Sequence, residues 1–235
     1  MIKFENTEVL GWEHAIRGMR NPKNSWAKSD SYWTYIEDPE TLQKAKFEYF
    51  VGDNDLALMH QLRNAGTDHR KYLRMIAVYV DITAPLYWWK EFDTYKVGTV
   101  ANSCSTMHKI HAKEFTLDDF SHEHLIDVEE DGFGDDEFRY HLIRLLDTLN
   151  CARKKYLKTK DKIYWWQMIQ LLPTSYNQKR TVMMNYEVLA NIYKPTSRLH
   201  HKLNEWNVDC DGSFCQWIES LPYSEIITGK DGMNG

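Results

Sequence analysis

The segment from Met75 to Lys109 constrains the fold more than any other part of the sequence. Its first part alternates apolar and polar residues and is rich in β-branched side chains, which is typical of a strand that reaches a core. The apolar positions there are Met75, Val78, Val80 and Ile82. Pro85 follows, and because proline has no amide hydrogen to donate, it suits the first turn of a helix. The sequence therefore predicts a strand that leads directly into a helix. The aromatic face of that helix carries Tyr87, Trp88, Phe92 and Tyr95.

Short polar side chains collect after this helix. Gly98 is followed by Asn102, Ser103, Cys104 and Ser105. Short donors and acceptors behind a rigid aromatic helix are what a nucleotide or flavin site needs, so this segment is a candidate site. Cys104 is also a candidate nucleophile, with His108 as the nearest base, but a thiol flanked by serines is more often inert packing.

Composition narrows the class of protein. With 235 residues and 43% hydrophobic side chains, the chain can bury the core of one domain, which we place at residues 1–227 with a flexible tail at 228–235. A net charge of −5 disfavours a nucleic-acid partner. Four unpaired cysteines, no signal peptide and no apolar run near ~20 residues predict a reduced, cytoplasmic protein without a membrane span. The nine Trp and fourteen Tyr suit planar ligands, subunit contacts or an aromatic core.

Local patterns predict the other elements. A strand is expected at residues 1–10, a loop at 21–37 and a strand-like end at 221–227. Helices are expected at 12–20, 38–50, 55–65, 138–157, 160–172, in a pair between 178 and 206, and at 213–220. Asp53 or Asn54 is the predicted cap of the third helix, and Gly66 is its left-handed stop.

Several charged segments allow two interpretations each. His69, Arg70 and Lys71 offer positive charge to a cofactor phosphate or form a solvated basic loop. The basic run at 153–162 is a solvated face or a phosphate or RNA contact. The acidic run at 127–137 is expected to be an exposed loop. Four histidines are metal ligands or, more commonly, surface side chains: His108, His111, His122 and His124.

The candidate segment resembles a motif of the flavin-dependent thymidylate synthases (ThyX). Those enzymes carry Arg-His-Arg, then seven residues, then Ser, written RHRxxSxNExSxR. Here Tyr95, Lys96 and Val97 stand in place of Arg-His-Arg, and seven residues separate them from Ser105. Asn102 matches the motif Asn, Ser103 replaces its Glu, and Met107 replaces its last Arg.

A second stretch carries the same resemblance. The family has Leu-Pro, eleven residues, an Asn that opens an Asn-x-x-x-x-x-Asn helix, then an Arg and a further helix. This chain has Leu172-Pro173, then Asn185 and Asn191 at that spacing, then Arg198. Asn185 and Asn191 lie on different sides of an ideal helix. The chain is therefore identified as similar to a divergent member of this family over most of its length.

The resemblance implies an α+β fold with a small antiparallel sheet flanked by long helices. It implies FAD as cofactor, NADPH and methylenetetrahydrofolate as co-substrates, and dUMP or a related pyrimidine deoxynucleotide as substrate. The family's active sites draw on several subunits of a homotetramer, so self-association is expected. Flavin hydride completes the methyl group, and arginine charge rather than a cysteine nucleophile activates the pyrimidine.

The resemblance also implies roles for individual residues. Catalysis would fall to Arg198 and Ser105, and substrate binding to Ser103, Ser105 and Arg198. Cofactor contacts would come from His69, Tyr95, Lys96, Asn102, Asn185 and Asn191. No metal is expected.

Lost positive charge separates this chain from the family pattern. Besides the replaced Arg-His-Arg and Met107, Ile169 stands where an Arg binds the substrate phosphate. Each charge-assisted contact typically represents ~1.5–3 kcal/mol, so the losses could remove most nucleotide affinity. Three hypotheses follow: a flavin-dependent one-carbon transferase, a catalytically silent relative that binds a nucleotide or a protein partner, and an oligomeric scaffold.

Overall fold

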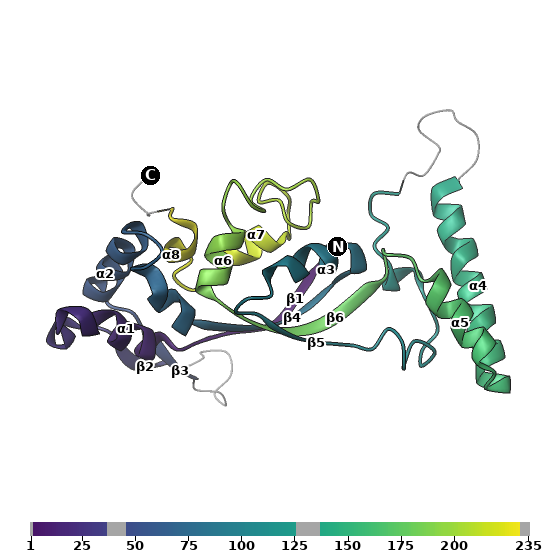
Figure 1. Cartoon of the computed structure of the whole chain (residues 1–235), viewed down its shortest axis with the longest axis horizontal. Helices are drawn as coiled ribbons and strands as arrows, with labels where there is room; N and C mark the ends of the chain where they lie inside the picture. Colours follow the sequence, from purple (N-terminus) through teal and green to yellow (C-terminus); the bar gives the residue numbers. More distant parts are fainter. Residues whose placement is uncertain (1, 37–45, 126–136, 231–235) are drawn as a thin grey trace. The chain divides into compact units, whose positions relative to one another are not determined.

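The computed structural model describes residues 2–36, 46–125 and 137–230, and it is α+β as predicted (Figure 1). The strands are β1 (Lys3–Leu10), β2 (Tyr32–Ile36), β3 (Lys46–Phe50), β4 (Ala77–Pro85), β5 (Val100–Ser103) and β6 (Asn177–Asn185). The helices are α1 (Trp12–Arg20), α2 (Asp53–Asn64), α3 (Leu86–Phe92), α4 (Glu137–Thr159), α5 (Lys162–Leu171), α6 (Tyr186–Ile192), α7 (Phe214–Glu219) and α8 (Glu225–Thr228).

The chain divides into two compact units. Unit 1 contains Met1–Glu5, Asp81–Thr94 and Ala101–Thr181, and unit 2 contains Asn6–Val80, Tyr95–Val100 and Val182–Gly235. The main sheet has the strand order β1-β4-β6-β5, and β2 and β3 form a separate antiparallel pair. Within the described residues, no helix is both long enough and apolar enough to cross a membrane.

The strand predicted at the start of the Met75–Lys109 segment is confirmed as β4. Its side chains alternate, so that Val78, Val80 and Ile82 are buried while Tyr79 is exposed. This period of two indicates a strand with one face in a core. Pro85 is the last residue of β4 and the N-cap of α3, whereas the sequence predicted it in the first turn of the helix. Three aromatic side chains of α3 are buried: Trp88, Trp89 and Phe92.

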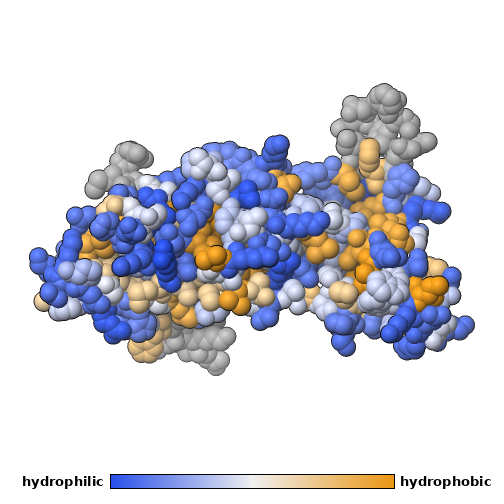
Figure 2. Space-filling view, viewed as in Figure 1, coloured by the Kyte–Doolittle hydropathy of each residue, from blue (hydrophilic) through white to orange (hydrophobic). Residues whose placement is uncertain are grey.

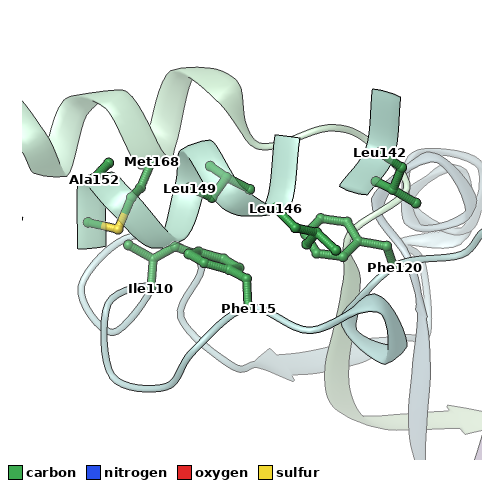
Figure 3. Close-up of a cluster of buried hydrophobic side chains, with 8 residues drawn as sticks. All are labelled: Ile110, Phe115, Phe120, Leu142, Leu146, Leu149, Ala152 and Met168. Carbon is green, nitrogen blue, oxygen red and sulfur yellow. The ribbon is translucent and has the colours of Figure 1, made fainter. Parts of the chain in front are cut away.

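The core of unit 1 forms where α4 and α5 meet the loop after β5 (Figure 3). Both long helices are confirmed, as α4 (Glu137–Thr159) and α5 (Lys162–Leu171). Leu142, Leu146 and Leu149 recur at three-and-four spacing and lie on one face of α4. They pack with the loop side chains Ile110, Phe115 and Phe120 and with Ala152 and Met168.

Unit 2 is organised around the buried carboxylate of Asp55 on α2. Asp55 is fully buried and forms an ion pair with Arg20, whose Nε lies 2.5 Å from Oδ1. The other carboxylate oxygen, Oδ2, accepts hydrogen bonds from the hydroxyls of Ser29 and Ser31 at 2.6 and 2.7 Å and from the backbone N–H of Asp30. One carboxylate therefore connects the end of α1, the loop before β2 and α2.

The predicted cap of α2 is wrong. Gly52 precedes the helix, and Asp53 is its first helical residue. The side chain of Asp30 accepts hydrogen bonds from the backbone N–H groups of Asn54 and Asp55, at 2.9 and 3.2 Å. Because this acceptor comes from a distant loop, local sequence gave no sign of it. Gly66 has a positive φ of 110°, as expected for a residue that follows a helix.

Five segments differ from the predicted elements. Residues 32–36 are strand rather than loop, and residues 46–50 are strand rather than helix, because they pair with each other through facing aromatic side chains. Residues 177–185 form β6 rather than helix. Residues 199–206 lie in turns, and 225–228 form α8 rather than a strand-like end.

Other predictions fall wholly or partly outside the described residues. The acidic run at 127–137, the start of the helix at Asp38 and residues 231–235 of the tail belong to this group. Of the described tail residues, Thr228 ends α8, and Lys230 donates a hydrogen bond to Glu219 at 2.5 Å.

Replacement of Asp55 by Ala should destabilise the protein by about 3–5 kcal/mol, because it leaves the buried guanidinium of Arg20 without its counter-ion. Urea unfolding followed by circular dichroism measures this difference. Asp53→Ala is the matched control, since Asp53 is exposed on the same helix and should change stability by less than about 1 kcal/mol.

The same pair predicts a dependence of stability on pH. Burial by itself raises the pKa of Asp55, but hydrogen bonds from Ser29, Ser31 and Arg20 outweigh it, so the pKa is lowered. A lowered folded-state pKa gives stability that is present above the unfolded-state value and is lost as the pH falls through the folded one. An acid titration of stability that is identical in the native protein and in Asp55→Asn would contradict this assignment.

Candidate functional site

Asn185 joins β6 to α6 and caps the helix. Its side-chain oxygen accepts a hydrogen bond from the backbone N–H of Val188 at 3.0 Å, which satisfies one of the N–H groups left open at the helix start. Asn185 therefore lies outside the helix, which corrects the prediction that it shares one helix with Asn191. Gly98 lies against it with a positive φ of 81°, and a Cβ at Gly98 would come within 3.2 Å of the Asn185 amide nitrogen.

Asn191, on α6, is part of a network of buried charge. Its side-chain oxygen accepts hydrogen bonds from Arg70 at 3.1 Å and from Lys194 at 2.7 Å. Arg70 also donates to Glu187 at 3.0 Å, and both of these side chains are about nine-tenths buried. Arg70 is therefore not part of a solvated loop, in contrast to its exposed neighbours His69 and Lys71.

Arg198 lies beside two adjacent aromatic rings, whose centres are 6.3 Å apart. The carbon of its guanidinium lies 5.6 Å from the ring centre of Tyr95 and 5.7 Å from that of Trp206. The Tyr95 hydroxyl and the Ser197 hydroxyl are hydrogen-bonded at 2.6 Å, and Trp206 is fully buried. Aromatic faces attract a guanidinium and restrict its motion, so the charge of Arg198 is fixed in place while the residue stays partly exposed.

The polar segment after α3 belongs largely to unit 1. All four residues of β5, Asn102 and Ser103 among them, are exposed. The backbone N–H of Cys104 donates to the carbonyl of Lys179 at 2.9 Å, which holds the chain beside β6. The Ser105 hydroxyl oxygen accepts a hydrogen bond from the backbone N–H of His108 at 2.8 Å.

A pocket of about 280 Å³ lies beside this segment within unit 1. Cys104 and Ser105 line it together with two lysines, Lys113 and Lys179, and both lysines are paired with carboxylates. A hydrogen bond from Lys113 to Asp119 raises the pKa of Lys113. The pocket is lined by hydroxyl and amide groups, and its two lysines are matched by two aspartates, Asp118 and Asp119. Such a lining suits a neutral polar ligand more than an anion. Neither lysine was predicted from the sequence: Lys179 lies far from the motif in the chain, and Lys113, eight residues after Ser105, carries no local signal of a site.

The predicted site residues therefore lie in two groups. Unit 2 contains His69, Tyr95, Lys96, Asn185, Asn191 and Arg198, and unit 1 contains Asn102, Ser103 and Ser105. Trp206 was also missed, since nothing in its local sequence marks it as a platform for Arg198. No group of three or more metal-binding side chains occurs among the described residues, and the histidines at 108–124 form none.

The basic run at 153–162 makes contacts within unit 1. Arg153 donates to the carbonyl of His111 at 3.0 Å, and Lys155 and Lys160 lie over the rings of Tyr164 and Tyr156. These contacts favour the interpretation of this segment as part of a helix surface.

The chain matches solved structures, although no family model and no curated protein matches its sequence. Over 100% of both chains, it is similar to thymidylate synthase X (ThyX) from Helicobacter pylori, solved with FAD and dUMP, with a TM-score of 0.62 and 14% identity. The chain has the fold of a flavin-dependent thymidylate synthase.

Two further structures share the ThyX fold. A second H. pylori ThyX complex with FAD and dUMP has a TM-score of 0.63 and 14% identity over 97% of this chain and 98% of that one. The UMP/dUMP methylase PolB from Streptomyces cacaoi, bound with 5-Br dUMP, has a TM-score of 0.56 and 15% identity over 97% and 95%. The resemblance found in the sequence is thus confirmed at the level of the fold.

The four cysteines should differ sharply in reactivity within this ThyX-like fold. Cys104 and Cys151 are exposed, whereas Cys215 is buried, and burial followed by the charge of Glu219 raises its pKa to about 12. A thiolate is the reactive form, so iodoacetamide near neutral pH should modify Cys104 and Cys151 in the folded protein and spare Cys215. Peptide mass analysis measures this, with urea-unfolded protein as the control. Equal labelling of Cys104 and Cys215 in the folded protein would contradict the structure.

Proposed function

We propose that this chain is a flavin-dependent enzyme that transfers a one-carbon unit to a pyrimidine deoxynucleotide, dUMP or a relative. The observation that carries the proposal is the guanidinium of Arg198 beside the adjacent rings of Tyr95 and Trp206, in a fold that ThyX and PolB share over 97–100% of this chain. The structures of those two proteins contain dUMP or 5-Br dUMP. The proposal goes beyond the fold, since identity to those chains is only 14–15%.

The residues proposed to hold FAD match its chemistry. The side-chain oxygens of Asn185 and Asn191 are committed within the protein, so their amide nitrogens would donate to the carbonyl oxygens of a flavin ring. Lys96 and His69 are exposed and would face the diphosphate, with Asn102 as a further donor. When bound, FAD supplies the hydride, and NADPH and methylenetetrahydrofolate are the proposed co-substrates.

Arg198 is proposed as the catalytic and substrate-binding charge. A fixed cation beside a pyrimidine carbonyl stabilises negative charge that develops there, and it costs little reorganisation because the rings already hold it. Ser103 and Ser105 are proposed to donate hydrogen bonds to the nucleotide. The Ser105 oxygen already accepts a backbone N–H, which orients its hydroxyl as a donor. Tyr95 and Lys96 stand where the family has Arg-His-Arg, so stacking on the Tyr95 ring would take over part of the binding that charge supplies in the family.

A catalytically silent relative is the second candidate. Val97 is 92% exposed at a position where the family motif has Arg, and Ile169 stands at the phosphate-binding Arg position. A protein with these changes could bind a nucleotide or a protein partner without turnover. Binding of dUMP without flavin would favour this candidate.

Flavin binding is the first test. Purified protein reconstituted with FAD should show the flavin absorbance bands after gel filtration, and dUMP should change the flavin fluorescence. Arg198→Met keeps a long side chain beside the rings but removes the charge, so dUMP affinity should fall at least about tenfold while FAD stays bound. Arg74→Met is the control, since Arg74 is an exposed cation of the same unit. A colourless protein after reconstitution, or unchanged dUMP affinity in Arg198→Met, would refute this assignment.

Self-association is proposed to involve α4 and α5. Figure 2 shows apolar side chains on the outer surface of these helices, where Ile143, Ile163, Trp166 and Leu171 are 41–57% exposed. Apolar surface of this extent commonly marks a contact with another chain. Light scattering should show an oligomer for the native protein and a smaller species for Ile163→Glu/Trp166→Glu. Lys154→Glu, on the exposed part of α4, is the control. A native protein that is monomeric would contradict the proposed contact.

A further inference from the structure

Unit 2 contains a second pocket, of about 660 Å³, that the proposed reaction does not use. It lies between the end of β1, the start of α1, the β2–β3 pair and the turn at Pro222–Tyr223. Five aromatic residues line it: Trp12, Trp33, Phe47, Tyr49 and Tyr223. Its volume is within the range of about 300–1,000 Å³ that is typical of small-molecule sites.

The aromatic walls are fixed by their own contacts. Trp33 and Tyr49 face each other across β2 and β3, with ring centres 5.1 Å apart in an edge-to-face arrangement. Trp12 and Tyr223 form a similar pair, also at 5.1 Å. Trp33 and Phe47 are nevertheless 56% and 68% exposed, so ring surface remains open toward the pocket.

Carboxylates dominate the charge of the pocket. Glu8, Glu13 and Glu48 line it together with one histidine, His14, and no lysine or arginine occurs among its described lining residues. The carboxylate of Glu13 accepts a hydrogen bond from the indole N–H of Trp33 at 3.2 Å, so at least one acid lies directly beside an aromatic wall. Burial and then the charge of Glu13 raise the pKa of Tyr49, which is consistent with negative potential at this ring.

The arrangement of the carboxylates favours an extended organic cation over a metal ion. Among the described residues, no three acidic, histidine or cysteine side chains converge as metal ligands do. A linear polyamine carries several ammonium groups separated by methylene chains. The ammonium groups can each meet a separate carboxylate, and the adjoining methylene groups can lie on aromatic faces.

We propose that this pocket binds a linear polyamine. The carboxylates would supply the charge that selects the ligand, and the rings would contact the chain between its ammonium groups. The inference is independent of the proposed flavin chemistry, because it uses none of the residues assigned to FAD or the nucleotide.

Isothermal titration of the purified full-length protein with spermidine tests the proposal. Saturable binding is expected, and it should weaken as salt is raised. Triethylene glycol, a neutral chain of similar length, should bind at least tenfold more weakly, and Mg²⁺ should not compete at equal concentration. Comparable binding of triethylene glycol, competition by Mg²⁺, or no binding of spermidine would overturn the proposal.

Variants locate the binding. Glu13→Gln/Glu48→Gln should weaken spermidine binding at least tenfold, and Trp33→Leu about threefold to tenfold. Glu114→Gln/Asp211→Asn removes two exposed carboxylates elsewhere and should leave the affinity unchanged. All substituted residues are exposed, so unfolding curves should match those of the native protein. Equal losses in the pocket and control variants would indicate non-specific attraction to the net negative charge and would refute the site.

Discussion

The buried carboxylate of Asp55 is the interaction on which the arrangement of unit 2 depends. It accepts hydrogen bonds from Arg20 at the end of α1 and from Ser29 and Ser31, the latter directly before β2. A buried charge is tolerated only when its lone pairs are satisfied, so these partners must keep their positions for the pair to exist. The same elements, α1 and β2, carry Trp12, Glu13 and Trp33 to the polyamine pocket. The pocket walls are therefore placed by an interaction that lies outside the pocket.

Arg198, the proposed catalytic group, is also positioned by neighbouring side chains. Arg198 lies in a turn, where a long flexible side chain would ordinarily lose entropy on binding a ligand. Tyr95 and Trp206 remove that freedom in advance. Tyr95 occupies the first position of the altered Arg-His-Arg motif, so a residue that replaced a cation here holds the cation that remains.

Helices and strands were predicted correctly where the pattern that marks them lies within the segment itself. β4, α3 and the two long helices were predicted because Val78 to Ile82 and Leu142 to Leu149 carry their periodicity within the segment itself. Residues 46–50 and 177–185 were predicted as helix because their strand state depends on partners distant in the sequence. The spacing of Asn185, Asn191 and Arg198 was visible in the sequence. The structural tasks of the two asparagine oxygens were not, since Arg70 and Lys194 reach Asn191 only in the folded chain.

The sequence by itself determined the strand-to-helix junction at Pro85, because the periodicity that marks it is local. The motif spacing gave the resemblance to the ThyX family, and that resemblance implied the α+β class. Only the tertiary structure decided which charges are buried and which are open to a ligand. In the folded chain Arg70 is buried and donates a hydrogen bond to Glu187. Trp206 lies beside Arg198. Five aromatic residues and three glutamates line one pocket. The physical reason is that burial, hydrogen-bond satisfaction and the field around a charge depend on neighbours that are remote in sequence.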